Sequence, residues 1–176
     1  PMCRIATLAV AAVLLPLAAK AHPGHGAGAG FVMGLAHPLT GWDHLAVLLC
    51  LGVLAARRGW RMALGAGLLM ATALMAGAAI GVAASQSTLI EPALFVTVLA
   101  SVFLLRFQAR IGHGVLLTLC LTFAMIHGVA HGQEAPVGGL AAYFAGLTLA
   151  SAAIYVAAIM GVHLLKNRPV DARSLR

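Results

Sequence analysis

The chain has 176 residues, of which 62% are hydrophobic and only 9% are charged. Soluble domains carry about 25% charged residues, so this composition excludes a soluble globular protein, and it is far too apolar for a disordered chain. The formal net charge of +7 does not indicate nucleic-acid binding, because the Lys and Arg residues are few and nine of the eleven lie in short connections and the tail. The composition predicts an all-α, multi-pass protein of the lipid bilayer.

Residues 1–21 have the pattern of a cleavable signal peptide. Arg4 provides a positive start, and the apolar stretch 5–19 is shorter than the roughly 20 residues needed to span a bilayer. The stretch ends in an A-x-A cleavage pattern at residues 19–21. We expect cleavage there, which would leave His22 as the mature N-terminus outside the membrane; an uncleaved, tilted anchor is the alternative.

The rest of the chain contains five apolar segments, each near or above the length that spans a bilayer. They cover residues 27–56, 62–84, 88–105, 111–132 and 138–165. The first segment is long and contains Pro38, which predicts a break or kink because proline has no N–H to donate within a helix. We therefore predict a transmembrane helical bundle over residues 22–165.

Basic residues give the predicted bundle an orientation. After the signal peptide, all nine Lys and Arg residues fall in the connection 57–61, the turn at 106–110 and the tail 166–176. None lies in the connections of the other side, which are residues 22–26, 85–87 and 133–137. Lys and Arg mark the cytoplasmic side, so we predict an outer N-terminus, a basic cytoplasmic tail at 166–176 and a location in a bacterial inner membrane.

Small residues are dense, and three pairs of glycines have the GxxxG spacing that allows helices to approach closely. The pairs are Gly30 and Gly34, Gly77 and Gly81, and Gly128 and Gly132. In a chain with 20 glycines such pairs also arise by chance, so they mark candidate contact faces.

Ionisable residues inside a predicted span are costly and indicate function by default. The first cluster is the segment His37-Pro38-Leu39-Thr40-Gly41-Trp42-Asp43-His44 of the first span. His37 and His44 are two helical turns apart, so both can face one way in a helix, and Pro38 and Gly41 loosen the backbone between them. Asp43 can bind a metal directly or accept the second N–H of an imidazole.

The second cluster lies at the end of the fourth span, in the segment 126–134. His127 and His131 are four residues apart and share one helix face, and Glu134 continues the same stripe. This spacing matches that of helical H-E-x-x-H zinc sites, but Gly128 stands where the catalytic glutamate of a metalloprotease would be. The pattern therefore favours metal binding without peptidase chemistry.

The predicted topology brings both clusters into the outer half of the bundle. At about 1.5 Å per residue, His37 lies roughly 14 Å below the outer end of the first span, and His127 lies roughly 8 Å below the end of the fourth, with His131 at the mouth. Imidazole and carboxylate groups suit Ni, Co, Zn, Mn or Fe, and imidazole also suits Cu(II). The candidate metal ligands are His37, Asp43, His44, His127, His131 and Glu134.

Other polar residues have simpler explanations. His113 and His163 are expected to form hydrogen bonds between helices, and Cys50 and Cys120 are expected to be small packing residues. The predicted mature N-terminus, His22-Pro23-Gly24-His25, is a candidate for a weak metal-capture site.

The two histidine motifs, together with the HPGHG that follows the signal peptide, resemble the HupE/UreJ family of membrane proteins. The family pattern H-P-x-x-G-x-D-H is matched in full at residues 37–44, and the pattern F-H-G-x-A-H-G-x-E is matched at 126–134 except that Ile126 replaces the aromatic residue. The resemblance implies a nickel or cobalt permease associated with hydrogenase or urease gene clusters. Members usually have a sixth span after the one corresponding to 138–165, so either five spans suffice here or another protomer supplies the missing helix.

The leading hypothesis is a permease that takes up Ni²⁺, or Co²⁺, from the periplasm. The ion would be a transported substrate, not a tightly bound cofactor. His131 and Glu134 would capture the ion at the mouth. His127 and His37 would pass it inward, and Asp43 with His44 would form the buried site. Metal binding needs neutral imidazole, so uptake is expected to fall as the pH drops through about 6.

Two other function classes stay open. One is a non-transporting membrane partner that recruits maturation proteins for hydrogenase or urease through its basic tail. The other is a membrane metalloenzyme, which would keep its metal tightly bound. The leading hypothesis implies no enzymatic activity and no nucleic-acid partner, and the sequence has no GxxxxGK[ST] motif for nucleotide hydrolysis. A homo-oligomer is compatible with it.

Overall fold

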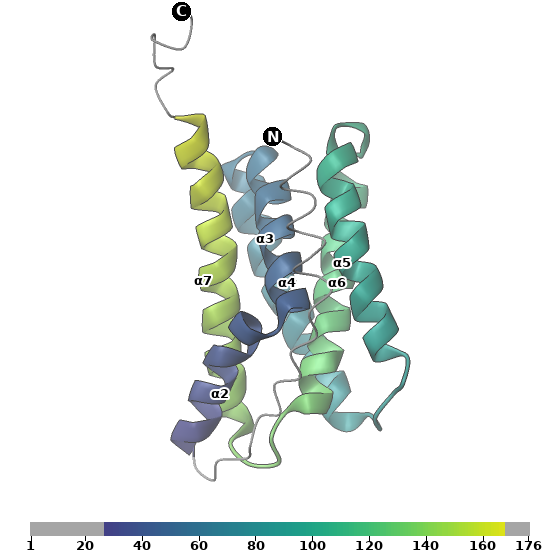
Figure 1. Ribbon diagram of the computed structural model, residues 1–176, viewed down its shortest axis with the longest axis vertical. Helices are drawn as coiled ribbons and strands as arrows, with labels where there is room; N and C mark the ends of the chain where they lie inside the picture. The colour runs from purple at the N-terminus through teal and green to yellow at the C-terminus, as the bar shows by residue number, and fades with distance from the viewer. Residues whose placement is uncertain (1–26, 168–176) are drawn as a thin grey trace, which may run out of the picture.

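The computed structural model describes residues 27–167, and within this range it consists of helices without a strand. The elements in chain order are α2 (Ala27–Thr40), α3 (Trp42–Arg57), α4 (Trp60–Ala83), α5 (Ile90–Phe107), the 3₁₀ turn η1 (Gln108–Arg110), α6 (His113–Glu134) and α7 (Leu140–Lys166). The long helices run side by side as a bundle (Figure 1). The predicted signal peptide at 1–21, the segment 22–25 and the tail from residue 168 onward lie outside the described residues.

Four helices are long and apolar enough to cross a membrane: α4, α5 together with η1, α6 and α7. α2 and α3 also qualify as a pair, although the chain bends by 72° between them, and counting this pair gives five spans. The predicted all-α membrane bundle is thereby confirmed. Its orientation, with the N-terminus outside, stays a prediction.

The basic residues of the described chain gather at one end of the bundle. The helices α3, α5 and α7 end there, and α4 and α6 begin there (Figure 1). We call it the basic end, and it carries Arg57, Arg58, Arg61, Arg106, Arg110 and Lys166. The opposite end is formed by α2 and by the connections from α4 to α5 and from α6 to α7.

Arg58 ties two connections together at the basic end. Its guanidinium donates hydrogen bonds to the main-chain carbonyl oxygens of Gln108 and, over 2.7 Å, of Ile111. These carbonyls lie just beyond the end of α5, and that of Gln108 also accepts the main-chain N–H of Ile111. The connection between α3 and α4 is therefore fastened to the connection between α5 and α6.

The break in the first span lies at Gly41, shortly after Pro38. Pro38 cannot donate to the carbonyl one turn earlier, yet α2 continues to Thr40. Gly41 then adopts an extended conformation with φ −80° and ψ 101°, and α3 begins at the next residue. A Cβ at position 41 would lie only 2.7 Å from the Nδ1 atom of His44, so glycine also makes room for that imidazole.

Glycines allow α4 and α6 to pack with their backbones in contact. Gly77 and Gly81 of α4 face Gly128 and Gly132 of α6. A Cβ added at any of the four would overlap a main-chain carbonyl oxygen of the other helix. Two of the three predicted glycine pairs therefore form a single helix–helix interface.

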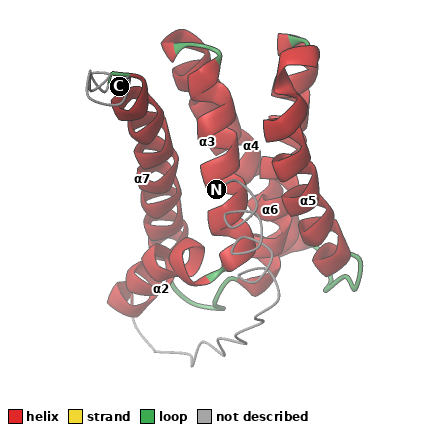
Figure 2. Ribbon diagram, turned by 45° about the horizontal axis from the view of Figure 1, so that its top comes forward, coloured by secondary structure: helices red, strands yellow, loops and turns green. Residues whose placement is uncertain are grey.

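The third glycine pair lies in α2, which turns away from the axis of α3 and packs against α7 (Figure 2). A Cβ at Gly34 would overlap the carbonyl oxygen of Tyr143, and one at Gly146 would overlap that of Phe31. This close contact holds α2 against α7 at the end of the bundle opposite to the basic end.

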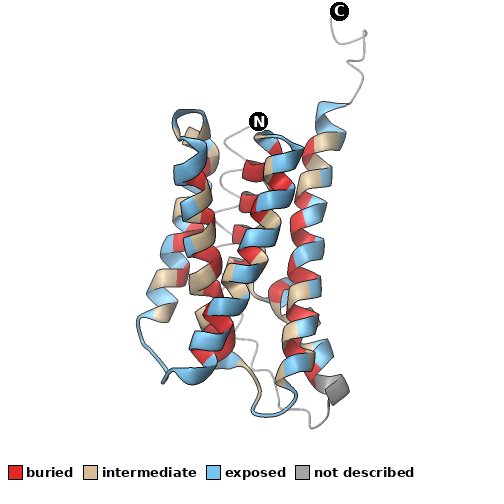
Figure 3. Ribbon diagram, turned by 180° about the vertical axis from the view of Figure 1, so that it is seen from behind, coloured by how far each residue is buried: buried red, intermediate tan, exposed pale blue. Residues whose placement is uncertain are grey.

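Burial follows the axis of the bundle. Buried positions lie on the sides of the helices that face one another, and exposed positions lie on the outside (Figure 3). Leu51, Leu54 and Leu147 have almost no exposed surface, whereas Leu68 is 72% exposed. An apolar outer surface is expected in a bilayer, because lipid tails are as apolar as leucine. Cys120 is buried within the apolar core, in agreement with the packing role expected for it.

Replacing Gly128 with alanine is expected to destabilise the bundle, because the new methyl group would overlap the backbone of α4. Overpacking of this kind costs roughly 1–3 kcal/mol, which should lower the thermal unfolding midpoint of the detergent-purified protein by several degrees. Gly65→Ala on α4 is the matched control, since nothing lies within 4 Å of the added Cβ. Equal midpoints for the two variants would contradict the close contact of α4 with α6.

Candidate metal centre

Four histidines from three helices meet inside the bundle, toward the end opposite to the basic end. His37 comes from α2, His44 from α3, and His127 and His131 from α6. The ring centroid of His44 lies 5.4 Å from that of His37, 4.9 Å from that of His127 and 4.3 Å from that of His131. The two sequence clusters thus form one group, with the His44 ring at its centre.

Two sets of three donor atoms in this group are close enough to be considered for a single ion. The entrance set belongs to His37, His44 and His131, and the inner set belongs to Asp43, His44 and His127. In each set all donor atoms lie within 4.8 Å of one another. Donors about 2.1 Å from an ion are at most about 4.2 Å apart, so small side-chain rotations would suffice for coordination.

The two sets share His44 and differ in depth. His127 lies one turn of α6 closer to the basic end than His131 does. The inner set is therefore displaced along the bundle axis, in the direction of the basic end, from the entrance set.

Hydrogen bonds orient two of the imidazoles. The Nδ1–H of His44 donates to the Oδ1 atom of Asp43 over 2.8 Å, and the Nδ1–H of His127 donates to the carbonyl oxygen of Phe123 over 2.9 Å. With the proton on Nδ1, the Nε2 atom of each neutral ring keeps its lone pair. Hydrogen bonds of this kind typically hold metal-binding histidines in position.

Several ring nitrogens of the group are buried and have no hydrogen-bond partner among the described residues. They are the Nε2 atoms of His37, His44 and His127, and the Nδ1 atom of His131. A buried polar atom without a partner costs about 1–3 kcal/mol, and such atoms are uncommon in native proteins. Four of them in one place indicate a ligand, and a cation would satisfy their lone pairs.

Exposure falls from the end of the bundle inward. The side chains of Glu134 and His37 are 43% and 26% exposed, and Glu134 Oε2 lies 3.2 Å from His37 Nε2 without hydrogen-bond geometry. His44, His127 and His131 are buried, with exposed fractions of 6%, 5% and 2%. Glu134 and His37 therefore form the entrance, and the three buried histidines lie behind it.

The order of depth differs from the sequence-based prediction. The sequence predicts His131 at the mouth of the site, but the structure buries this residue and places His37 at the entrance. The reason is the 72° bend at Gly41, which carries His37 over His131, where the two ring centroids lie 4.8 Å apart. The break that Pro38 predicts in the first span is confirmed, and it lies at Gly41, between His37 and His44.

Other ionisable residues do not join the group. Glu91 lies in the first turn of α5 and is exposed at the end opposite to the basic end, whereas His113 is exposed at the start of α6. His163 lies in the last turn of α7. Cys50 and Cys120 are free thiols and belong to neither donor set.

Tyr143 of α7 is a neighbour that the histidine motifs do not reveal. Its side chain is 1% exposed, and its ring centroid lies 6.0 Å from that of His37. Within the described part of the chain its buried hydroxyl has no hydrogen-bond partner. A tyrosine inside an apolar span is the one sequence signal that points to it, because a buried hydroxyl usually requires a polar neighbour.

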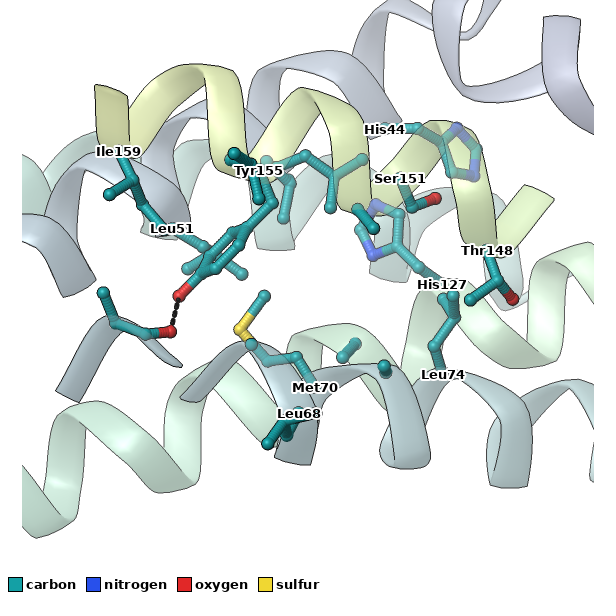
Figure 4. Close-up of a pocket in the computed structure, with 18 of the residues that line it drawn as sticks. His44, Leu51, Leu68, Met70, Leu74, His127, Thr148, Ser151, Tyr155 and Ile159 are labelled. Carbon is teal, nitrogen blue, oxygen red and sulfur yellow. Dashed lines mark hydrogen bonds between the residues drawn. The ribbon is translucent and has the colours of Figure 1, made fainter. Parts of the chain in front are cut away.

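A cavity of about 260 Å³ lies beside the buried histidines, between α3, α4, α6 and α7. His44, His127 and His131 line it, and most of the remaining wall is apolar. Figure 4 shows His44 and His127 at one end of the cavity and Ile159 at the other. The centre is therefore open on two sides: to the entrance at Glu134 and His37, and to this cavity.

These features define a multi-pass helical membrane protein with a group of buried histidines and two neighbouring carboxylates. A family model described as HupE / UreJ protein matches residues 10–175, and the chain belongs to this family. It is 29% identical over 154 residues to Protein HupE of Rhizobium leguminosarum bv. viciae, which covers 87% of this chain and 80% of that protein. No solved structure is a significant match. The family is linked to nickel or cobalt uptake or to hydrogenase and urease maturation, and it is a transporter and accessory family, not a family of enzymes.

Binding of a divalent metal at this centre should stabilise the purified protein, because a ligand that binds only the folded state adds about 2.7 kcal/mol at 100 times its Kd. Ni²⁺ is expected to raise the thermal unfolding midpoint of the unmodified protein. His44→Ala is expected to abolish the shift, because both donor sets include His44. His163→Ala is the control and should retain the shift. A full shift in His44→Ala would place metal binding elsewhere.

Proposed function

We propose that this protein is a permease for the uptake of a divalent transition metal, with Ni²⁺ as the expected substrate and Co²⁺ as the second candidate. The observation that carries the proposal is the pair of donor sets that share His44 and lie behind an exposed entrance. A single closed site would retain its ion, whereas neighbouring incomplete sites allow an ion to enter and leave. Membership of the HupE/UreJ family supports the same function.

The proposed route begins at Glu134 and His37, where a carboxylate and an imidazole can replace part of the hydration shell of the ion. The ion then moves to the entrance set and from there to the inner set. His44 is a ligand in both sets, so the ion exchanges some ligands while one remains bound. The route runs from the periplasm inward if the basic end is cytoplasmic, as the distribution of Lys and Arg predicts.

Asp43 has a positioning role in this proposal and can also be a ligand. Its carboxylate accepts the Nδ1–H of His44, which keeps the Nε2 atom of that ring free for the metal. Carboxylate and imidazole donors suit Ni²⁺ and Co²⁺, but they also suit Zn²⁺. Competition between Ni²⁺, Co²⁺ and Zn²⁺ for uptake therefore identifies the transported ion.

Uptake in cells tests the proposal directly. In a bacterial strain without its own nickel transporter, the unmodified protein is expected to raise Ni²⁺ accumulation. His37→Ala, Asp43→Ala and His131→Ala should each reduce that accumulation by roughly tenfold or more, as expected for groups that bind a metal or orient its ligands. Co²⁺ and Zn²⁺ are added as competitors.

His113→Ala is the control for these variants, because His113 is exposed at the start of α6 and lies outside both donor sets. Its uptake should equal that of the unmodified protein. If all three site variants accumulate Ni²⁺ as the unmodified protein does, the permease proposal is refuted.

The accessory function in metal-centre maturation is the second candidate, since the family is also linked to it. Under that alternative the basic tail would recruit partner proteins, and the histidines would be dispensable. Deleting residues 166–176 should leave Ni²⁺ accumulation within about twofold of the full chain if the protein is a permease. The accessory function would be favoured instead if neither the full chain nor the deletion raised Ni²⁺ accumulation and the deletion lost hydrogenase or urease maturation.

A further inference from the structure

The cavity beside the histidines extends a long way toward the basic end. Its lining on α7 begins at Thr148 and ends at Ile159, and its lining on α4 reaches Ala63 in the first turn of that helix. At about 1.5 Å per residue, the stretch of α7 corresponds to roughly 16 Å. The cavity therefore leads from the metal centre to within one turn of the basic end of α4.

The side chain of Tyr155 lies in the part of this cavity toward the basic end, one turn of α7 before Ile159, where the lining on that helix ends (Figure 4). It reaches from α7 across to α4, where its hydroxyl donates a hydrogen bond of 2.8 Å to the carbonyl oxygen of Ala63. Tyr155 is 6% exposed and packs in the same apolar core as Leu51 and Met70. The tyrosine thus bridges α7 and α4 across the cavity near its basic end.

The bond between Tyr155 and Ala63 can break without unwinding α4. Ala63 lies inside the helix, so its carbonyl also accepts the helical N–H of the residue four positions later, and a carbonyl oxygen has two lone pairs. Loss of the tyrosine bond therefore leaves no buried carbonyl without a partner. The residue four positions later is Gly67, where an added Cβ would lie 2.8 Å from Cε1 of Tyr155. Glycine at this position gives the aromatic ring its space.

Most of the cavity wall cannot replace the hydration shell of a metal ion. Beyond the histidines the lining consists mainly of aliphatic side chains, with Thr148, Ser151 and Tyr155 as the hydroxyl-bearing residues. Hydrophobic constrictions of this kind gate ion passage by excluding water. An ion released from the inner set therefore needs the basic end of the cavity to open and admit water.

From this geometry we infer that Tyr155 is the inner gate of the transport route: its hydroxyl must leave Ala63 before an ion passes from the histidines to the basic end. The inference rests on the proposed transport function. Its test measures access to the cavity and needs no metal, so the gate and the transport function can fail separately.

The test uses a single reporter cysteine inside the cavity. Cys3, Cys50 and Cys120 are replaced with alanine, and Ala124, which lines the cavity, is replaced with cysteine. Membrane vesicles of both orientations are treated with a charged, membrane-impermeant thiol reagent. A charged reagent is needed because exposed side chains such as Leu68 also line the cavity, so a lipid-soluble reagent would enter from the bilayer.

Tyr155→Phe removes only the hydroxyl and is expected to speed labelling from the basic end by about three- to tenfold, the effect of losing one hydrogen bond. Gly67→Ala keeps the hydroxyl but crowds the ring, so it should also speed labelling. Thr148→Val is the matched control: it removes the hydrogen bond of 3.5 Å from Thr148 Oγ1 to Met75 Sδ, a link between the same two helices at the far side of the cavity. It should leave labelling from the basic end unchanged.

The gate is overturned if Tyr155→Phe labels at the rate of the unmodified background, or if Thr148→Val speeds labelling as much. An equal increase from both sides of the membrane would mean loosened packing and would overturn it as well. If labelling responds as expected but metal uptake does not depend on the histidines, the transport function fails while the closure by Tyr155 stands. If uptake depends on the histidines and labelling does not respond, only the gate fails.

Discussion

The bend at Gly41 is the constraint on which the metal centre depends. In a continuous helix, His37 and His44 would be separated by a rise of about 10 Å, which is too far for two side chains to share an ion easily. The 72° bend brings the ring centroids to 5.4 Å. Gly41 permits this arrangement because a side chain there would collide with the imidazole of His44. The close contact of Gly34 with α7 then holds α2 in its bent position.

The second histidine motif combines ligands and packing in one stretch of α6. His127 and His131 face the centre of the bundle, and the glycine that follows each of them lies against the backbone of α4. Adjacent residues of a helix point about 100° apart, so one H-G repeat can serve two neighbouring faces. The close packing on the glycine face makes α6 a firm support. That support offsets part of the cost of burying imidazole nitrogens that have no partner within the described chain.

Much of this arrangement follows from the sequence, because apolar length and periodicity report how many helices there are and which side chains share a face. The spans and the meeting of the two histidine clusters are of this kind, whereas the glycine pairs marked candidate contact faces without showing which helices they bring together. The angle between α2 and α3 is set by tertiary packing, and so the entrance position of His37 could not be predicted. The contacts of Gly146 and Tyr143 could not be predicted for a related reason. Their partners lie on α2, more than 100 residues earlier in the sequence, and no short motif spans that distance.

The hydrogen bonds of Arg58 have a mechanical consequence. They join the hairpin of α3 and α4 to that of α5 and α6 at the basic end, so these four helices should behave as one body. α7 is linked to α4 by side-chain hydrogen bonds, and at its other end it carries α2 through the contact of Gly34 and Gly146. A tilt of α7 would therefore displace His37 as well as Tyr155.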